Sequence, residues 1–210
     1  MISVPIGEPS FFIFHLVLVL LTIFFCFLGS ASASAEEAAV LFKWKASISN
    51  PDNLLLTSWS LQQNSSLCSW YGVSCINGSV NRLNLSDSNI NGTLYNFPFS
   101  SLPNLEYIDM GNNELWGSIP PQIGNLSKLI YLDLQGGALS NEIPREIGLL
   151  KNLHALHLNR NNLNGSIPEE IGQLRFLNDL ALAANNLDGP IPASFDVGRR
   201  LLFYWNIKTD

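Results

Sequence analysis

Residues 150–173 read LKNLHALHLNRNNLNGSIPEEIGQ, and the same apolar pattern recurs every 24 residues in the windows around it. Each window opens with Leu-x-x-Leu, continues with a short apolar-x-apolar segment and closes with Ile-Pro and a further apolar residue. The window starts are Leu102, Leu126, Leu150 and Leu174. One unit cannot bury its own apolar edge, whereas stacked units can. The spacing therefore predicts a curved solenoid with one short strand per unit.

Alternation along each predicted strand separates a core face from a concave face. In the segment 131–135, Leu132 and Leu134 are expected to point inward. The residues between and beside them, Tyr131, Asp133 and Gln135, then point to the concave surface. An asparagine follows at one register in most units, where an inward amide can satisfy backbone groups that the bend leaves unpaired. These asparagines are Asn113, Asn161 and Asn185.

Some units depart from the template. Gly137 stands where other units carry the asparagine, and Asn141 replaces a glycine, so we expect this unit to be the least regular. Residues 80–94 read as an earlier, degenerate unit with Ser88 at the asparagine position. One extra loop residue separates it from the next unit.

The carboxyl-terminal segment also departs from the template. Leu201 and Tyr204 still fit the spacing, which predicts a partial strand, and we assign residues 198–210 to a partial repeat or an atypical tail. A solenoid without a polar terminal unit leaves apolar edge residues in need of cover. Either the apolar run 201–205 folds over that edge, or the chain is a truncated product.

The amino-terminal segment sets the expected compartment. Residues 11–28 are almost wholly apolar and lead into a small-residue run in which Ala33 and Ala35 suit cleavage before Glu36. We therefore assign residues 1–35 to a signal peptide and expect a secreted, extracellular protein. Because the apolar run is long enough to cross a bilayer, an uncleaved membrane anchor is the alternative. No further transmembrane span is predicted.

Composition agrees with an extracellular glycoprotein. The net charge is -6 without a basic stripe, which argues against nucleic-acid binding. Charged residues make up only 13%, so solubility can depend on glycans, and Asn-x-Ser/Thr sequons supply acceptor sites. We do not expect a glycan on Asn84, which lies on a predicted strand between two core leucines. The expected sites are Asn64, Asn77, Asn91, Asn125 and Asn164.

Residues 36–79 differ from the repeats and are predicted to cap the open end of the solenoid. Apolar residues at helical spacing predict a helix over residues 36–48, and a second short helix is expected through residues 54–56. Cys68 and Cys75 form a pair in an oxidising compartment, so we predict a disulfide rather than two free thiols. The apolar positions of the first helix are Ala38, Leu41, Trp44 and Ile48.

Cap and repeats together resemble a known family. Residues 68–75, CSWYGVSC, are similar to the paired-cysteine cap of plant leucine-rich-repeat receptor-like kinases and receptor-like proteins. The pattern Asn-x-Leu-x-Gly-x-Ile-Pro over residues 161–168 resembles the plant-specific repeat class of the same families. The resemblance implies an α/β leucine-rich-repeat solenoid: a curved right-handed superhelix with a parallel concave sheet and an extra strand from the Ile-Pro half. A helical, disulfide-bonded cap over residues 36–79 would precede about five units over residues 80–197.

The resemblance also implies a function. Ectodomains of this family perceive secreted peptides or bind partner repeat receptors, so we expect an extracellular recognition module, not an enzyme, with no cofactor and no metal. Outward aromatic residues on rigid strands are good anchors for a peptide or protein ligand. Cross-strand packing is the alternative role of the two tyrosines. The candidate binding residues on the concave face are Arg82, Tyr107, Asp109, Tyr131, Asp133, His157, Asn159 and Asp179.

Other chemistry has weaker support. Asp109, Asp133 and His157 share one register and could mimic an acid-base site, but we interpret the row as a solvated polar stripe without a pocket. His154 and His157 are three apart, which on a strand places them on opposite faces and argues against a shared metal. Trp116 stands where most units carry a small polar residue, and it marks an interface or contacts a glycan.

Alternative functions remain open from the sequence. Some plant repeat proteins of this type inhibit secreted enzymes that degrade cell-wall polysaccharides, although that family normally has about twice as many units and a cysteine-closed end. A truncated receptor fragment without independent function is the third possibility.

Overall fold

The computed structural model describes residues 15–19, 34–62, 66–195 and 202–204. Most of the predicted signal peptide and the Asn64 sequon lie outside these residues. Residues 15–19 are helical, and a helix over residues 34–45 opens the cap. No helix in the described part of the chain combines the length and apolar character needed to span a bilayer.

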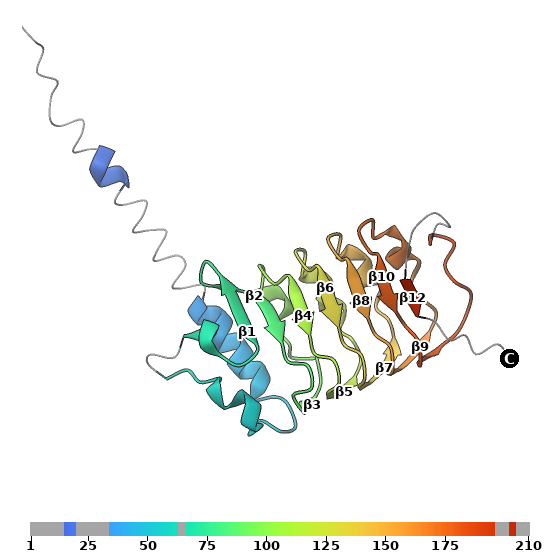
Figure 1. Cartoon of the computed structure of the whole chain (residues 1–210), viewed down its shortest axis with the longest axis horizontal. Coiled ribbons are helices and arrows are strands. Elements are labelled where there is room, and N and C mark those ends of the chain that lie inside the picture. The colour runs from blue at the N-terminus through green and yellow to red at the C-terminus, as the bar shows by residue number, and fades with distance from the viewer. Residues whose placement is uncertain (1–14, 20–33, 63–65, 196–201, 205–210) are drawn as a thin grey trace, which may run out of the picture.

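The main sheet runs along the concave face of the solenoid (Figure 1). An antiparallel hairpin, β1 with β2, starts the sheet, and every later strand pairs in parallel with its predecessor. From β2 to β12 each strand comes from the next repeat unit, as the 24-residue period predicts. The strands are β1 (Val73–Ile76), β2 (Ser79–Asn84), β4 (Tyr107–Asp109), β6 (Tyr131–Asp133), β8 (Ala155–His157), β10 (Asp179–Ala181) and β12 (Leu202–Tyr204).

A second parallel sheet follows one flank, which we call the lateral sheet (Figure 1). It lies just before the Ile-Pro dipeptides and confirms the extra strand that the family resemblance implies. Its strands are β3 (Asn91–Gly92), β5 (Glu114–Gly117), β7 (Ala138–Glu142), β9 (Asn162–Gly165) and β11 (Asn186–Leu187).

Short 3-10 helices complete each turn on the convex side. Three of them begin directly after the proline of an Ile-Pro dipeptide, at Pro120, Pro144 and Pro168. Proline holds its φ near −65° and lacks an N–H, so it suits the residue before a helical turn. The helices are η1 (Leu54–Ser58), η2 (Leu67–Ser69), η3 (Phe99–Ser101), η4 (Pro121–Asn125), η5 (Arg145–Leu149) and η6 (Glu169–Gln173).

Template leucines and isoleucines form one continuous core. Leu132, Leu156 and Leu180 face each other across paired strands and are at most 1% exposed. Burying such a side chain contributes about 1.5–3 kcal/mol. Because each unit is in contact only with its neighbours, this stabilisation recurs between every pair of adjacent units.

The asparagine ladder joins successive turns through buried amides. Asn161 Nδ2 donates to the carbonyls of Leu134 (2.8 Å) and Leu158 (3.1 Å), and its Oδ1 accepts from the N–H of Leu139 (3.0 Å). Equivalent bonds surround the two asparagines at Asn113 and Asn185.

Gly137 interrupts this ladder, yet its unit keeps the rest of the repeat geometry. β7 still pairs with both lateral neighbours. Asn141 has φ 67°, in the left-handed region that Gly117 and Gly165 occupy in the adjacent units. Asparagine tolerates this conformation better than most residues. The irregularity expected for this unit is therefore confined to the missing amide.

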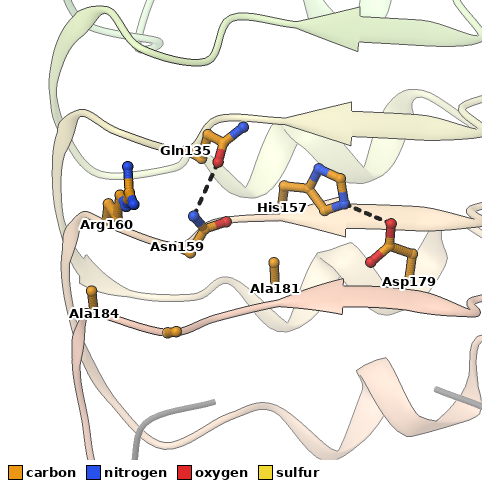
Figure 2. Close-up of a pocket in the computed structure, with 8 residues that line it drawn as sticks. Gln135, His157, Asn159, Arg160, Asp179, Ala181 and Ala184 are labelled. Atoms are coloured by element: carbon orange, nitrogen blue, oxygen red, sulfur yellow. Dashed lines mark hydrogen bonds and ion pairs between the residues drawn. The ribbon is translucent and has the colours of Figure 1, made fainter. Parts of the chain in front are cut away.

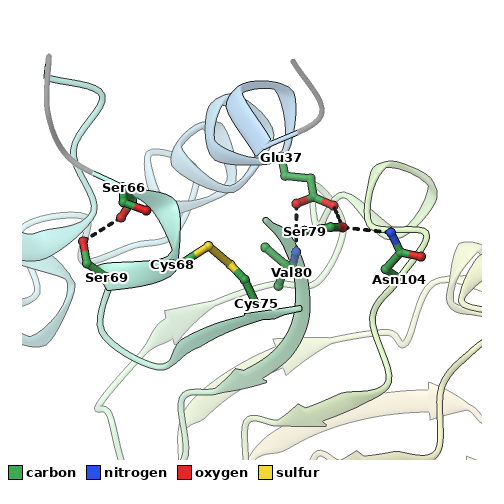
Figure 3. Close-up of a disulfide and its surroundings, with 8 residues drawn as sticks. All are labelled: Glu37, Ser66, Cys68, Ser69, Cys75, Ser79, Val80 and Asn104. Atoms are coloured by element: carbon green, nitrogen blue, oxygen red, sulfur yellow. Dashed lines mark hydrogen bonds between the residues drawn. A yellow bond between two sulfur atoms is a disulfide. The ribbon is translucent and has the colours of Figure 1, made fainter. Parts of the chain in front are cut away.

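Aromatic packing and a buried carboxylate secure the cap. The indoles of Trp59 and Trp70 stack with centroids 5.3 Å apart, and Trp44 packs against Trp59 at 6.2 Å. Glu37, on the first helix, is buried and accepts from Ser79 Oγ at 2.7 Å and from the Val80 N–H at 2.9 Å (Figure 3). The carboxylate thereby fixes the cap helix to β2, a role that the sequence did not reveal.

The carboxyl-terminal strand is present, but its register differs from the template. β12 pairs in parallel with β10, and Phe203 lies opposite Leu180. The 24-residue template places Tyr204 there instead, so the prediction for that residue is wrong by one position. The connection that leads into β12 therefore has one residue fewer than the repeat provides.

The predicted disulfide joins Cys68 and Cys75 and closes a short loop between η2 and β1 (Figure 3). Replacing both cysteines with Ser is expected to lower the free energy of unfolding by about 2–3 kcal/mol, because the open chain gains conformational entropy. Thermal denaturation of the secreted protein measures the change, with the exposed Ser74→Ala as control. An unchanged melting temperature would contradict a structural role for the bond.

Asn161→Ala removes one amide of the ladder. We expect a loss of about 2–4 kcal/mol in unfolding free energy, since buried backbone groups of Leu134, Leu139 and Leu158 lose partners. The neighbouring exposed residue provides a matched control, Asn162→Ala, which should change stability by less than about 0.5 kcal/mol. Urea denaturation compares the two variants, and equal effects would show that the ladder does not stabilise the stack.

Candidate functional site

Four side chains form a stacked column across the concave face. The Arg82 guanidinium carbon lies 3.7 Å from the Tyr107 ring centroid, and Tyr107 stacks on Tyr131 with centroids 4.3 Å apart and planes 5° apart. His157 then meets the Tyr131 ring edge-on at 5.5 Å. In-register parallel strands lie about 4.8 Å apart, which matches the spacing of stacked rings. The two tyrosines therefore do pack across strands.

Each tyrosine hydroxyl turns toward a carboxylate of its own strand. Tyr131 Oη donates to Asp133 Oδ2 at 3.1 Å, and Tyr107 Oη donates to Asp109 Oδ2 at 3.4 Å. The Gln135 N–H and side-chain amide also donate to Asp133. Asp133 is only 3% exposed, so the prediction of a fully solvated stripe is wrong at this residue. The side chains of Tyr131, His157 and Gln135 surround the Asp133 carboxylate and exclude water from it.

His157 bridges two carboxylates. Its Nδ1 lies 3.1 Å from Asp133 Oδ2, and its Nε2 lies 3.0 Å from Asp179 Oδ2. The hydrogen bond to Asp133 is the main cause that raises the pKa of His157 to about 9. The imidazole is therefore a cation at neutral pH, with both nitrogens engaged, and has no free lone pair with which to act as a base.

The two carboxyl groups of the register differ in acidity. Burial opposes ionisation of Asp133, yet the bonds from His157 and the Gln135 N–H hold its pKa below the usual range. At Asp109, burial is the larger effect and raises the pKa of the carboxyl. Asp133 thus forms an ion pair with His157, whereas Asp109 has no equivalent ion pair among the described residues.

A hollow of about 600 Å³ opens beside His157 at the next units (Figure 2). The space is open because three small side chains line it at the end of β10 and just after it: Ala181, Ala183 and Ala184. Asn159 Nδ2 donates to Gln135 Oε1 at 3.0 Å along one side. Asp179 Oδ1 has no hydrogen-bond partner within the described residues. The exposed Arg160 adds a positive charge at the rim (Figure 2).

The structure brings the predicted binding residues onto one face. The stacked column carries the first part, and the hollow, which the sequence did not predict, is lined by His157, Asn159 and Asp179. A run of small residues at outward strand positions was the available signal for it. His154 lies away from this face, stacked on Phe176 at 5.5 Å. No group of three or more potential metal ligands occurs among the described residues.

Comparison with known proteins identifies the family. The family model described as "Leucine rich repeat N-terminal domain" matches residues 34–76, and "Leucine Rich Repeat" matches residues 104–126 and 152–174. A chain in the crystal structure of the BIR3–SERK2 complex from Arabidopsis thaliana aligns with TM-score 0.68 and 36% identity, over 77% of this chain and 89% of that one. The protein belongs to the plant leucine-rich-repeat receptor family.

Receptor relatives of this family are much longer. The Arabidopsis thaliana protein "MDIS1-interacting receptor like kinase 2" is 48% identical over 114 residues, which is 53% of this chain and 11% of that protein. The leucine-rich-repeat ectodomain of the Arabidopsis receptor kinase HAESA, in complex with a peptide hormone ligand, aligns with TM-score 0.69 and 33% identity, over 78% of this chain and 27% of that one. The chain spans about 11% of the length of the first curated relatives it matches.

The His157 bridge makes the stability of this receptor-family protein depend on pH. Because the folded pKa exceeds the unfolded value of 6.5, the contribution is fully present below about pH 6.5 and is lost as pH rises through 9. We expect the wild type to lose on the order of 2–3 kcal/mol over this range, and His157→Gln to lose far less. His154→Gln, away from the carboxylates, is the control. Identical pH profiles for all three proteins would contradict the bridge.

Proposed function

We propose that this protein is an extracellular recognition module whose concave face binds a peptide or a partner leucine-rich-repeat receptor. The column of Arg82, Tyr107, Tyr131 and His157 is the observation that supports this most strongly. Its side chains are already held by mutual contacts. Binding of a ligand would therefore cost little additional side-chain entropy in the protein. Their outward edges offer aromatic surface and charge on a rigid strand platform.

The hollow next to the column supplies unused hydrogen-bonding capacity. Arg160 is an exposed donor on one side of the alanine floor (Figure 2). A ligand that lies along the column would place polar groups here. The stack would supply contact area, and the hollow would supply direction and specificity.

The similar structures support this proposal because they contain bound partners. The BIR3–SERK2 structure is a complex, and this chain covers most of the aligned partner, which favours a short repeat receptor as ligand. HAESA is in complex with a peptide hormone, which keeps a peptide as the second class of ligand. We further propose that the apolar leader over residues 1–35 directs the chain to the secretory pathway, with cleavage before Glu36.

The test is direct binding of the secreted full chain to immobilised plant repeat ectodomains, beginning with those of SERK2 and BIR3, and to IDA, the peptide hormone ligand in the HAESA structure. We expect at least one partner to bind, and Tyr131→Ala to weaken its Kd by about 10–30-fold, as for a central aromatic anchor. The matched control is Phe176→Ala, an exposed aromatic that stacks on His154 away from the column.

Circular dichroism first shows that each variant is folded. Loss of binding in folded Tyr131→Ala with retention in Phe176→Ala supports the concave face as the site. Absence of binding across the panel, or equal binding by both variants, contradicts the proposal. Recovery of a polysaccharide-degrading enzyme from wall extracts would favour the inhibitor function instead.

A further inference from the structure

The lateral sheet presents one large exposed aromatic residue, Trp116 on β5, which is 49% exposed. Its paired neighbour on β7 is Ala138. On the other side, continuation of the β3–β5 register, Asn91 with Glu114 and Gly92 with Leu115, brings Thr93 opposite Trp116. Both neighbours are small, so neither can cover an indole ring. About half of the Trp116 side chain is therefore open to a group attached to a neighbouring strand.

A sequon lies on the adjacent strand and faces the same way. Asn91, Gly92 and Thr93 form Asn-Gly-Thr, with Gly92 buried and its two neighbours outward. An ideal Cβ built at Gly117 would lie 3.6 Å from Thr93 Cγ2, so the end of β5 lies against this sequon. Asn91 and Trp116 are thus diagonal neighbours on the outer face of adjacent strands, a separation that a long side chain can bridge.

The Asn91 side chain is already oriented. Its Nδ2 donates to Glu114 Oε2 at 2.7 Å, and its backbone N–H donates to Asn50 Oδ1 at 2.9 Å. An amide nitrogen that carries a sugar keeps one N–H, so the bond to Glu114 can persist after modification. The carboxylate would then hold the first sugar in a defined direction from the strand.

We propose that Asn91 carries an N-linked glycan whose first sugar residues pack on the indole of Trp116. In the transfer, the Asn91 amide nitrogen forms a bond to C1 of a lipid-diphosphate-linked oligosaccharide. The bond between C1 and the phosphate oxygen breaks, the lipid diphosphate leaves, and the amide loses one proton. The C–H face of the attached pyranose then covers the aromatic surface that the sheet leaves open.

The repeat provides an internal control for this assignment. Asn164 stands at the same place in its unit, in an Asn-Gly-Ser sequon on β9. In the following unit the residue equivalent to Trp116 is Asp188, which offers no aromatic surface. The two sites therefore share backbone and sequon and differ in whether an indole lies next to them. A glycan on Asn164 would extend into solvent without a platform.

This inference goes beyond the proposed ligand and depends only on the proposed secretory route. The experiment compares hydroxyl-radical oxidation of Trp116, read by mass spectrometry of its peptide, in the secreted full chain and in Asn91→Gln. We expect a substantial glycan occupancy at Asn91 and a several-fold slower oxidation of Trp116 in the wild type. Asn164→Gln should leave that oxidation rate unchanged.

A second measurement covers the case in which Asn91→Gln is not secreted. Glycosidase treatment of folded wild-type protein should raise Trp116 oxidation to the same extent. It should also lower the melting temperature by about 2–4 °C, and by less in Trp116→Ala. An unmodified Asn91 in secreted protein, or Trp116 oxidation that does not respond to glycan removal, would overturn the proposal. Failure of secretion by wild type would instead contradict the secretory route.

Discussion

Burial of in-register aliphatic side chains between successive turns is the constraint on which the structure depends. A single turn exposes its leucines at both edges, and only a neighbour with the same spacing can cover them. Leu132, Leu156 and Leu180 show the result, because each lies opposite the next and is closed to solvent. The parallel backbone pairing and the asparagine amides then satisfy the polar groups that this stacking carries into the interior.

The same register generates the candidate binding face. A 24-residue period fixes which side chains repeat at the spacing of adjacent strands, so Tyr107 and Tyr131 become a stack and Asp109 and Asp133 a row beneath it. On the next strand, His157 takes the position of the aspartates, so an acidic residue is replaced by one that forms an ion pair with Asp133. The site is therefore a consequence of small sequence differences between units that share a backbone, which is how repeat proteins vary their binding surfaces.

Much of this could be predicted from sequence because it depends on periodicity. The strands and the core faces follow from spacing, and the disulfide follows from a cysteine pair in an oxidising compartment. The second sheet was predicted only because the family resemblance implies it. Burial of Asp133 could not be predicted, since it depends on how Tyr131 and His157 lie over it in three dimensions. Burial of Glu37 could not be predicted either, because it depends on how the cap helix packs on β2.

The stacking account is tested most directly by changing the number of turns without changing the register. A second copy of residues 126–149 inserted before Leu150 adds one whole unit, and the account predicts a secreted protein with an undiminished melting temperature. Small-angle X-ray scattering should show a maximum dimension longer by about 5 Å, one rung of the sheet. A one-residue insertion at the same point should lower the melting temperature strongly. Equal tolerance of both insertions, or collapse on addition of the whole unit, would contradict the account.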